Sequence, residues 1–305
     1  MGAPSNEQAG ESLGAGASGP ATLSDAYAHS LSLVRQLDPD RYAATLFAPA
    51  ASRPHLFALY AFSAEIARVR DAVSSPMPGE IRLQWWRDAL EGTARGDAAA
   101  NPVAAALEDT IARFELPRGA LLDMIDARVF DLYDDPMPST GDLEGYLGET
   151  SSALVRLASI VLAGGRNPEG AEAAGHAGVA YGISRLLRAL PWDARAGRLY
   201  LPKDILDRHG VTRDDVVLGR GGPGFLAALA DLRAMARTHL ERVRELHGMI
   251  EPATRSAFLP IALVRGDLAR MERPDYDPFR TILERSPLSR LLAMGWTHLV
   301  GFGRG

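Results

Sequence analysis

The sequence predicts an all-α fold in a single domain, and three observations predict it. From Thr22 onward, apolar residues recur at intervals of three and four, as they do on helices, and proline and glycine separate these segments. No segment alternates between apolar and polar side chains like a half-buried strand, and no internal repeat of fixed period occurs. The chain has 305 residues, 47% of them hydrophobic and 23% charged, which is enough for a sizeable buried core.

The expected helices lie between these punctuation signals. Ser24 before Asp25, and Pro102 directly after Asn101, are signals for helix starts. The glycines at 164–165 and in 219–224 mark stops and loops. The expected helices span residues 23–36, 40–48, 53–73, 78–95, 101–114, 117–132, 139–146, 150–164, 168–190, 202–208, 212–218, 222–248, 252–272 and 288–299.

The ends and the composition of the chain limit its partners and location. Residues 1–20 are rich in Gly, Ala and Ser, which predicts a disordered tail before a helical domain over 21–305. No signal peptide and no run of 18 apolar residues is present, so we expect a cytoplasmic protein. The net charge of −5 argues against nucleic acid as a partner, and the absence of cysteine excludes thiolate metal sites. The segment 288–296 is a short amphipath with a tryptophan, which leaves open a peripheral position at the inner face of the cytoplasmic membrane.

The segment 56–71, LFALYAFSAEIARVRD, is apolar on most faces of a helix, which is typical of a central, buried helix. Tyr60, Ala64, Ala67 and Asp71 share one face, so a single carboxylate stands there among small side chains. The alternative is a plain core helix that ends in a solvated, arginine-rich turn. Elsewhere, Asp123, Asp126 and Asp131 are expected on a solvated helix face, and the paired tryptophans at 85–86 in the core.

Two segments carry a resemblance to a known family. Residues 56–71 resemble the first signature helix of the squalene/phytoene synthase family, the head-to-head prenyltransferases. Residues 185–206, RLLRALPWDARAGRLYLPKDIL, resemble the second Asp-rich box of that family with its Gly-Arg-x-Tyr-Leu-Pro tail. The resemblance extends thinly from about Tyr27 to about Leu292. It implies an isoprenoid synthase fold, with helices around a central cavity in which Asp-rich helices hold Mg²⁺ ions against a substrate diphosphate.

The sequence departs from the family pattern at most of its metal-binding positions. The first box keeps only Asp71, and the second keeps Arg188 and Asp193. Pro191 is expected to break or kink the helix where the second set of ligands would lie. The remaining box positions carry Ala64, Ala67, Arg68, Arg185, Ala189 and Trp192, and Asp38-Pro39-Asp40-Arg41 replaces the Ser-x-Ser-Phe diphosphate motif.

These departures weaken the expected metal site. One arginine about 4 Å from a bound cation costs on the order of 4 kcal/mol at an effective dielectric of 20. We therefore expect no cofactor, and Mg²⁺ on Asp71 and Asp193 only if the chain is catalytically active. Anion binding is expected instead from Arg185, Arg188, Arg198 and Tyr200, beside a cavity lined by Tyr60, Ala64, Ala67, Gly182 and Ala189. The alternative is that these arginines pair with Asp71, Asp193, Asp204 or Glu65.

The pattern of loss resembles one branch of the family. The run 62–71, the helix around Gln84-Trp85-Trp86 and the segment 201–205 look like the branch that contains the mitochondrial complex I assembly factor with this domain. That resemblance implies weak Asp boxes and a peripheral membrane role in respiratory complex assembly. The first hypothesis is a non-catalytic factor that binds an isoprenoid or lipid-like ligand and respiratory-complex assembly partners. The second is a divergent prenyltransferase that condenses two farnesyl or geranylgeranyl diphosphates, and a third is a scaffold with a collapsed pocket.

Overall fold

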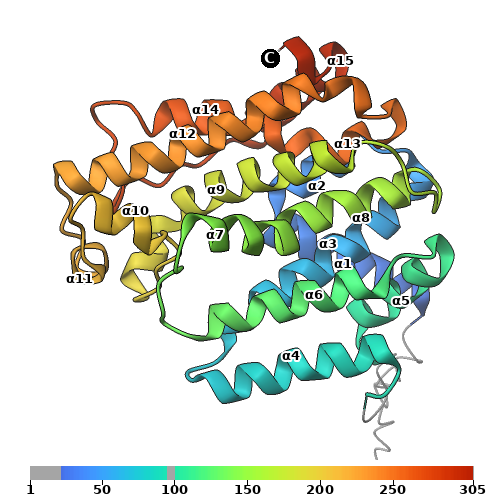
Figure 1. Cartoon of the computed structure of the whole chain (residues 1–305). Helices are drawn as coiled ribbons and strands as arrows, with labels where there is room; N and C mark the ends of the chain where they lie inside the picture. Colours follow the sequence, from blue (N-terminus) through green and yellow to red (C-terminus); the bar gives the residue numbers. More distant parts are fainter. Residues whose placement is uncertain (1–21, 95–99, 305) are drawn as a thin grey trace, which may run out of the picture.

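The computed structural model describes residues 22–94 and 100–304, and within them every regular element is helical (Figure 1). The all-α, single-domain prediction is confirmed. The predicted tail at residues 1–20 lies outside the described residues. The α-helices are α1 (Leu23–Leu37), α2 (Pro39–Thr45), α3 (Arg53–Ala67), α4 (Pro76–Glu91), α5 (Pro102–Phe114), α6 (Arg118–Val129), α7 (Thr140–Leu147), α8 (Ala153–Leu162), α9 (Ala171–Arg195), α10 (Lys203–Arg208), α11 (Arg213–Val217), α12 (Pro223–Glu245), α13 (Arg255–Phe258), α14 (Val264–Arg270) and α15 (Pro287–Val300).

Short 3₁₀-helical or π-helical turns adjoin several of these helices. The 3₁₀ turns that matter below are η2 (Arg70–Ala72), η4 (Phe130–Leu132) and η8 (Leu259–Leu263), and η5 (Gly148–Ser152) is a π-helical turn between α7 and α8. None of the helices in the described parts of the chain is both long and apolar enough to cross a membrane.

Local signals explain most helix ends. Asn101 caps α5 by accepting from the amides of Val103 and Ala104, with Pro102 at the first helical position as expected. The capping residue of α1 is Thr22 rather than Ser24, in a reciprocal capping box with Asp25.

Two expectations about helix continuity were wrong, and proline is involved in both. Residues 252–272 form several short pieces rather than one helix, because Pro260 has no amide hydrogen to continue the ladder. Pro191, by contrast, does not end α9, which continues to Arg195. The Ala196 amide still reaches the Trp192 carbonyl at 3.0 Å, so the last turn closes beyond the proline.

The helices pack in layers around α3 and α9. In Figure 1, α12, α9, α8, α6 and α4 lie one below another, and α3 and α1 lie behind them. The central helix α3 is buried along most of its length, as its sequence predicts; Phe62 and Leu59, for example, are fully buried. The glycines of α9 bring η5 unusually close: a Cβ at Gly178 would overlap the backbone of Ser152, and one at Gly182 would lie 2.5 Å from Leu147 Cδ2. This close contact places the end of α7 and η5 against the middle of α9.

Candidate functional site: a charged cavity at the end of α3 and α9

A cavity of about 350 Å³ opens where the C-terminal ends of α3, α6 and α9 meet η5. It brings together eight of the residues that the sequence predicted for a site: Ala67, Asp71, Gly182, Arg185, Ala189, Asp193, Arg198 and Tyr200. The other lining residues are Arg70, Arg128, Asp131, Tyr146, Leu147, Thr150, Ser151, Leu186 and Trp192. These residues come from five separate stretches of the chain, so only the fold assembles the cavity.

Arg198 lies between the two predicted carboxylates. Its guanidinium Nη1 donates to Asp71 Oδ1, and its Nε lies 3.1 Å from Asp193 Oδ1. The side chain of Asp193 is 14% exposed and that of Asp71 is 53% exposed, so the pair is desolvated mainly on the Asp193 side. One arginine therefore occupies the space between the last carboxylate of each predicted box.

Burial makes Asp193 a weaker acid than an ordinary aspartate despite this arginine. Burial raises the pKa of Asp193 to about 6, and the negative charges of Asp131 and Asp71 add to the effect, while Arg198 opposes it. Burial also raises the pKa of the neighbouring Tyr200 phenol well above its ordinary value, so this hydroxyl stays protonated at neutral pH. The cavity wall thus combines a carboxyl of raised pKa with a hydroxyl that remains a donor at neutral pH.

A third carboxylate, that of Asp131, faces the cavity, contrary to the prediction from the sequence. Asp131 was expected on a solvated helix face, but it is 5% exposed. Its Oδ1 accepts from the Tyr146 hydroxyl at 2.8 Å, and its Oδ2 accepts from Arg128 at 3.0 Å. Asp123 and Asp126 are exposed as expected. At 100° per residue, Asp131 lies about 80° from Asp123 and about 140° from Asp126 around the helix, so it is on a different face, which packs against Tyr146.

Comparison with known proteins decides the family. A family model described as squalene/phytoene synthase matches residues 34–291. The chain belongs to the squalene/phytoene synthase family. It is 32% identical over 286 residues to a rat protein named NADH dehydrogenase (ubiquinone) complex I, assembly factor 6, covering 92% of this chain and 85% of the relative. It is 33% identical over 205 residues to presqualene diphosphate synthase of Rhodopseudomonas palustris, covering 66% and 69%.

A solved structure supports the same fold. The squalene synthase from Alicyclobacillus acidocaldarius superimposes with a TM-score of 0.71 at 24% identity, over 84% of this chain and 97% of that one. The predicted isoprenoid synthase fold is therefore confirmed.

The Mg²⁺ cluster implied by the family does not fit the residues present. Magnesium requires several oxygen ligands in near-octahedral geometry. Arg198 already pairs with Asp71 and Asp193, and Arg128 with Asp131, so each cavity carboxylate has a cation as its neighbour. In the part of the chain that the structure describes, no group of three or more His, Cys, Asp or Glu side chains is arranged to hold a metal ion. A divalent ion in this cavity would have to displace arginines.

The cavity has more cationic than anionic side chains. Four arginines and three aspartates line it. Arg185 is the most exposed of these arginines, at 44%, and within residues 22–94 and 100–304 it forms one ion pair, a long one of 3.6 Å to Asp38. Arg70 pairs with the exposed Asp134, and the Nε atoms of Arg70 and Arg128 find no acceptor in this described part of the chain. The arrangement favours an anion over a metal cation.

Three predicted residues lie away from this cavity. Arg188 lies below it in a buried ionic network, donating to Asp40 at 3.0 Å and to Asp267 at 3.2 Å, so it is not available as an anion-binding group. Tyr60 is 4% exposed and packs under the Arg41 guanidinium at 5.7 Å from its ring centroid. Ala64, one turn before Ala67 on α3, is not among the lining residues.

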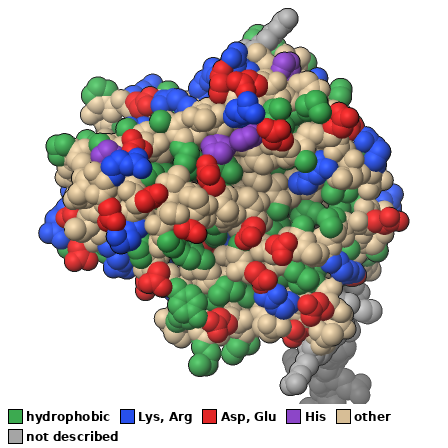
Figure 2. Space-filling model, in the orientation of Figure 1, with side chains coloured by type: hydrophobic (Ala, Val, Ile, Leu, Met, Phe, Trp, Pro, Cys, Tyr) green, Lys and Arg blue, Asp and Glu red, His purple; other side chains and the backbone are tan. Residues whose placement is uncertain are grey.

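A larger cavity, about 550 Å³, lies elsewhere, between α4, α5 and α6. Its charged lining residues are Glu91, Glu108 and Arg118; Arg118 binds Glu108 and also donates to the Leu90 carbonyl at 2.7 Å. This lining has two glutamates and one arginine rather than a group of arginines, so the smaller cavity remains the better candidate for an anion site. On the face shown in Figure 2, acidic and basic side chains are interspersed rather than gathered by sign, which gives no support to a nucleic-acid surface.

Proposed function

We propose that this chain is a non-catalytic member of the squalene/phytoene synthase family that binds one anionic isoprenoid or lipid-like ligand without metal and acts in the assembly of respiratory complex I. The observation that carries the proposal is the position of Arg198 between Asp71 and Asp193. In a metal-dependent synthase, carboxylates at such positions must be free to hold Mg²⁺. In this chain, Asp71 and Asp193 instead pair with Arg198, a cation of the protein itself.

The excess of arginine supports an anionic head group as the ligand. Arg185, at the mouth of the cavity, is 44% exposed and only loosely paired, so an incoming phosphate need not break a strong ion pair to reach it. The planar guanidinium binds phosphate oxygens in pairs. Tyr200, which also lines the cavity, supplies a hydroxyl donor. The apolar part of the ligand would lie along Leu147, Leu186 and Trp192.

The size of the cavity supports one ligand rather than two. Sites for single ligands measure about 300–1,000 Å³. At about 350 Å³, this cavity is near the lower end of that range. A head-to-head condensation requires two prenyl diphosphates side by side, so a cavity of this size favours the single-ligand proposal.

The binding proposal is tested by titrating the protein with farnesyl diphosphate in the presence of EDTA. Binding is measured by calorimetry and by quenching of the fluorescence of Trp192, the tryptophan that lines the cavity. The intact chain is expected to bind, and Arg185→Ala to weaken binding by at least about tenfold, because a charge-assisted contact to phosphate is lost. The matched control is Arg208→Ala, which removes an arginine that pairs with Asp231 outside the cavity and should leave binding unchanged. Failure of the intact chain to bind, or equal loss in both variants, would overturn the proposal.

The assembly role rests on the relatives named assembly factor 6. A factor that helps to build a membrane complex is expected at the cytoplasmic face of the membrane, in contact with assembly partners. Deletion of its gene is expected to lower the amount of assembled complex I on native gels, with restoration by the intact chain. Normal amounts of complex I after deletion would exclude this role while leaving the ligand-binding test unaffected.

The second candidate is a divergent prenyltransferase, favoured by the three carboxylates on the cavity wall and by the similarity to presqualene diphosphate synthase. It predicts release of pyrophosphate from farnesyl or geranylgeranyl diphosphate on addition of Mg²⁺, with loss of this activity in Asp71→Asn. Detection of such Asp71-dependent turnover would replace the non-catalytic proposal.

A further inference from the structure

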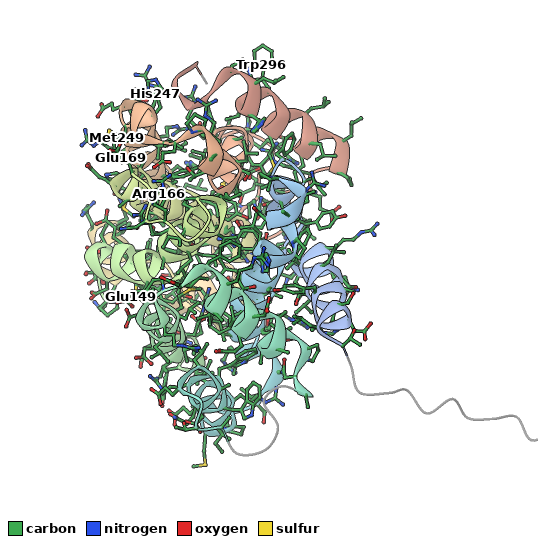
Figure 3. All side chains as sticks on the ribbon, turned by 90° about the vertical axis from the view of Figure 1, so that its right-hand side faces the viewer. Glu149, Arg166, Glu169, His247, Met249 and Trp296 are labelled. Carbon is green, nitrogen blue, oxygen red and sulfur yellow. The ribbon has the colours of Figure 1, made fainter. Side chains whose placement is uncertain are left out.

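The last long helix, α15, has an apolar face turned to solvent. Four large apolar side chains repeat along it at intervals of three and four residues: Leu288, Leu292, Trp296 and Leu299, exposed by 65%, 64%, 65% and 81%. Figure 3 shows Trp296 projecting away from the ribbon at the edge of the molecule. Isolated exposed leucines are ordinary, but a continuous stripe of them along one helix face is not.

The opposite face of α15 packs against the core, so the exposed stripe is not the face that holds this helix on the rest of the fold. Met294 is fully buried, and Arg290 reaches inward to bind Asp40 at 2.6 Å. These two residues lie on the side of the helix away from Leu292. The helix therefore has two apolar faces, and only one of them is covered within the described chain.

The exposed stripe carries no charge. The only ionisable side chains of α15 are Arg290, which is engaged with Asp40, and His298, which packs at 5.4 Å against the ring of Phe47. A specific protein interface normally has polar and charged groups around its apolar centre that fix the orientation of the partner. The stripe alone offers no such groups.

The size of the stripe argues against a second copy of the chain as its partner. A helix of 14 residues is about 21 Å long and about 10 Å wide, so one face covers roughly 200 Å². A stable dimer buries about 800 Å² on each partner. The tail at residues 1–21 is also a poor cover, because its only large apolar side chains are Met1 and Leu13.

We infer that the α15 stripe docks the protein on a lipid surface. A bilayer needs no complementary shape, and an amphipathic helix lies in its interface with the apolar side chains about 5–10 Å deep. Tryptophan favours this depth, because its ring is apolar and its N–H remains near water. The inference does not depend on what the charged cavity binds, and it adds a specific surface to the membrane-face location proposed above.

Because the α15 stripe carries no charge, docking is not expected to require anionic lipids. The chain carries a net charge of −5, and the stripe contributes no cation. Docking is therefore driven by apolar burial, and pure phosphatidylcholine vesicles are expected to bind the protein at least as well as vesicles containing 30% phosphatidylglycerol. Raising the salt concentration is expected to leave binding on phosphatidylcholine unchanged.

The test is flotation of the full chain with these two kinds of vesicle. The intact protein should float, and the double variant Leu292→Ser/Trp296→Ser should lose at least about tenfold in partition coefficient, because two large side chains no longer enter the lipid. The matched control is Met77→Ser/Ile81→Ser, which removes two side chains of α4 that are 70% and 65% exposed; it should float like the intact protein. Brominated phosphatidylcholine should quench the fluorescence of the intact chain and quench Trp296→Phe much less.

Each contrary result has a distinct meaning. The inference is overturned if the intact chain does not float, if the α4 control loses binding as strongly as the α15 variant, or if binding needs phosphatidylglycerol and disappears in salt. It is also overturned if the intact chain is a dimer in solution and the α15 variant a monomer, since a second copy would then cover the stripe. An unchanged far-UV circular dichroism spectrum is the check that the α15 variant is folded, and failure of the intact chain to bind farnesyl diphosphate would count against the proposed function rather than this surface.

Discussion

Arg290 of α15 donates from Nε to Oδ1 of Asp40 in α2 at 2.6 Å, across 250 positions of sequence. Asp40 is 2% exposed and also accepts from Arg188 at 3.0 Å. Burial alone would raise the pKa of Asp40, but the two arginines outweigh it and hold the pKa below its usual range. One buried carboxylate thereby connects the second helix, the long central helix α9 and the last helix.

Substitution of Asp40 is expected to destabilise the whole fold. Asp40→Asn leaves two buried guanidinium groups with a neutral partner, and loss of one member of a buried ion pair costs about 3–5 kcal/mol. We expect a loss of this size in the free energy of unfolding, measured by urea denaturation. Asp207→Asn is the matched control, because it breaks a pair with Lys203 in which both side chains are more than half exposed, and should cost less than about 1 kcal/mol. Similar losses in the two variants would contradict the structural role of Asp40.

The close packing of α9 on η5 gives a second prediction. A Cβ at Gly178 would overlap the backbone of Ser152, which cannot move aside as a flexible side chain can, so Gly178→Ala should destabilise by about 1–3 kcal/mol or more. Gly175→Ala lies on the same helix with nothing within 4 Å of the added methyl group, and should stabilise by about 0.5–1 kcal/mol through helix propensity. Thermal denaturation of both variants measures the difference. Equal effects would show that α9 and η5 are not in this contact.

Local patterns in the sequence predicted the helices and part of the cavity wall. Apolar residues all round 56–71 indicated a buried helix, and helical spacing put Ala67 and Asp71 on one side, where both now line the cavity. What local patterns could not predict was long-range pairing. Arg188 was expected at the anion site, but its partners Asp40 and Asp267 lie 148 and 79 positions away.

Asp131 was missed for a different physical reason. It was grouped with Asp123 and Asp126 as one acidic face, although five residues at 100° each place it about 140° around the helix from Asp126. Its hydrogen-bond partner on that side, Tyr146, lies 15 positions further along the chain and gives no local signal. The useful signal was the pair Arg128 and Asp131, three residues apart, because an inward carboxylate needs a nearby cation.

A pair of histidines between α9 and α12 predicts a loss of stability in mild acid. The Nδ1 atoms of His176 and His239 lie 2.8 Å apart, so one ring donates and the other accepts. Burial, and then the charge of His239, lower the pKa of His176, so the folded state takes up a proton there less readily than the unfolded state. This contribution to stability is complete above the unfolded pKa of about 6.5 and is lost as the pH falls below it. The other groups facing His176 are Glu172, Glu144 and Arg242.

The measurement is the free energy of unfolding at pH 7 and pH 5. We expect His176→Gln to lose less stability over this interval than the intact chain. His29→Gln, at an exposed position of α1, is the control and should follow the intact chain. The prediction is contradicted if the free energy of unfolding falls by the same amount between pH 7 and pH 5 in the intact chain, in His176→Gln and in His29→Gln.

Asp193 predicts a pH dependence of opposite sign. Burial raises its pKa to about 6 from an ordinary value of 3.8, so the folded state binds this proton more tightly than the unfolded state. Acidification from pH 7 therefore favours folding at this site: the gain begins as the pH falls through about 6, is complete below about 3.8, and is on the order of 3 kcal/mol. Other carboxylates with lowered pKa values, such as Asp40, act in the opposite direction and dominate the total.

The contribution of Asp193 is therefore isolated as a difference between proteins. The free energy of unfolding of the intact chain minus that of Asp193→Asn should rise as the pH is lowered from 7 to 4, because asparagine does not titrate. Asp123→Asn, on the exposed face of α6, is the control and should give a nearly constant difference. A flat difference for Asp193→Asn would mean that pairing with Arg198 offsets the effect of burial on the pKa of this carboxylate.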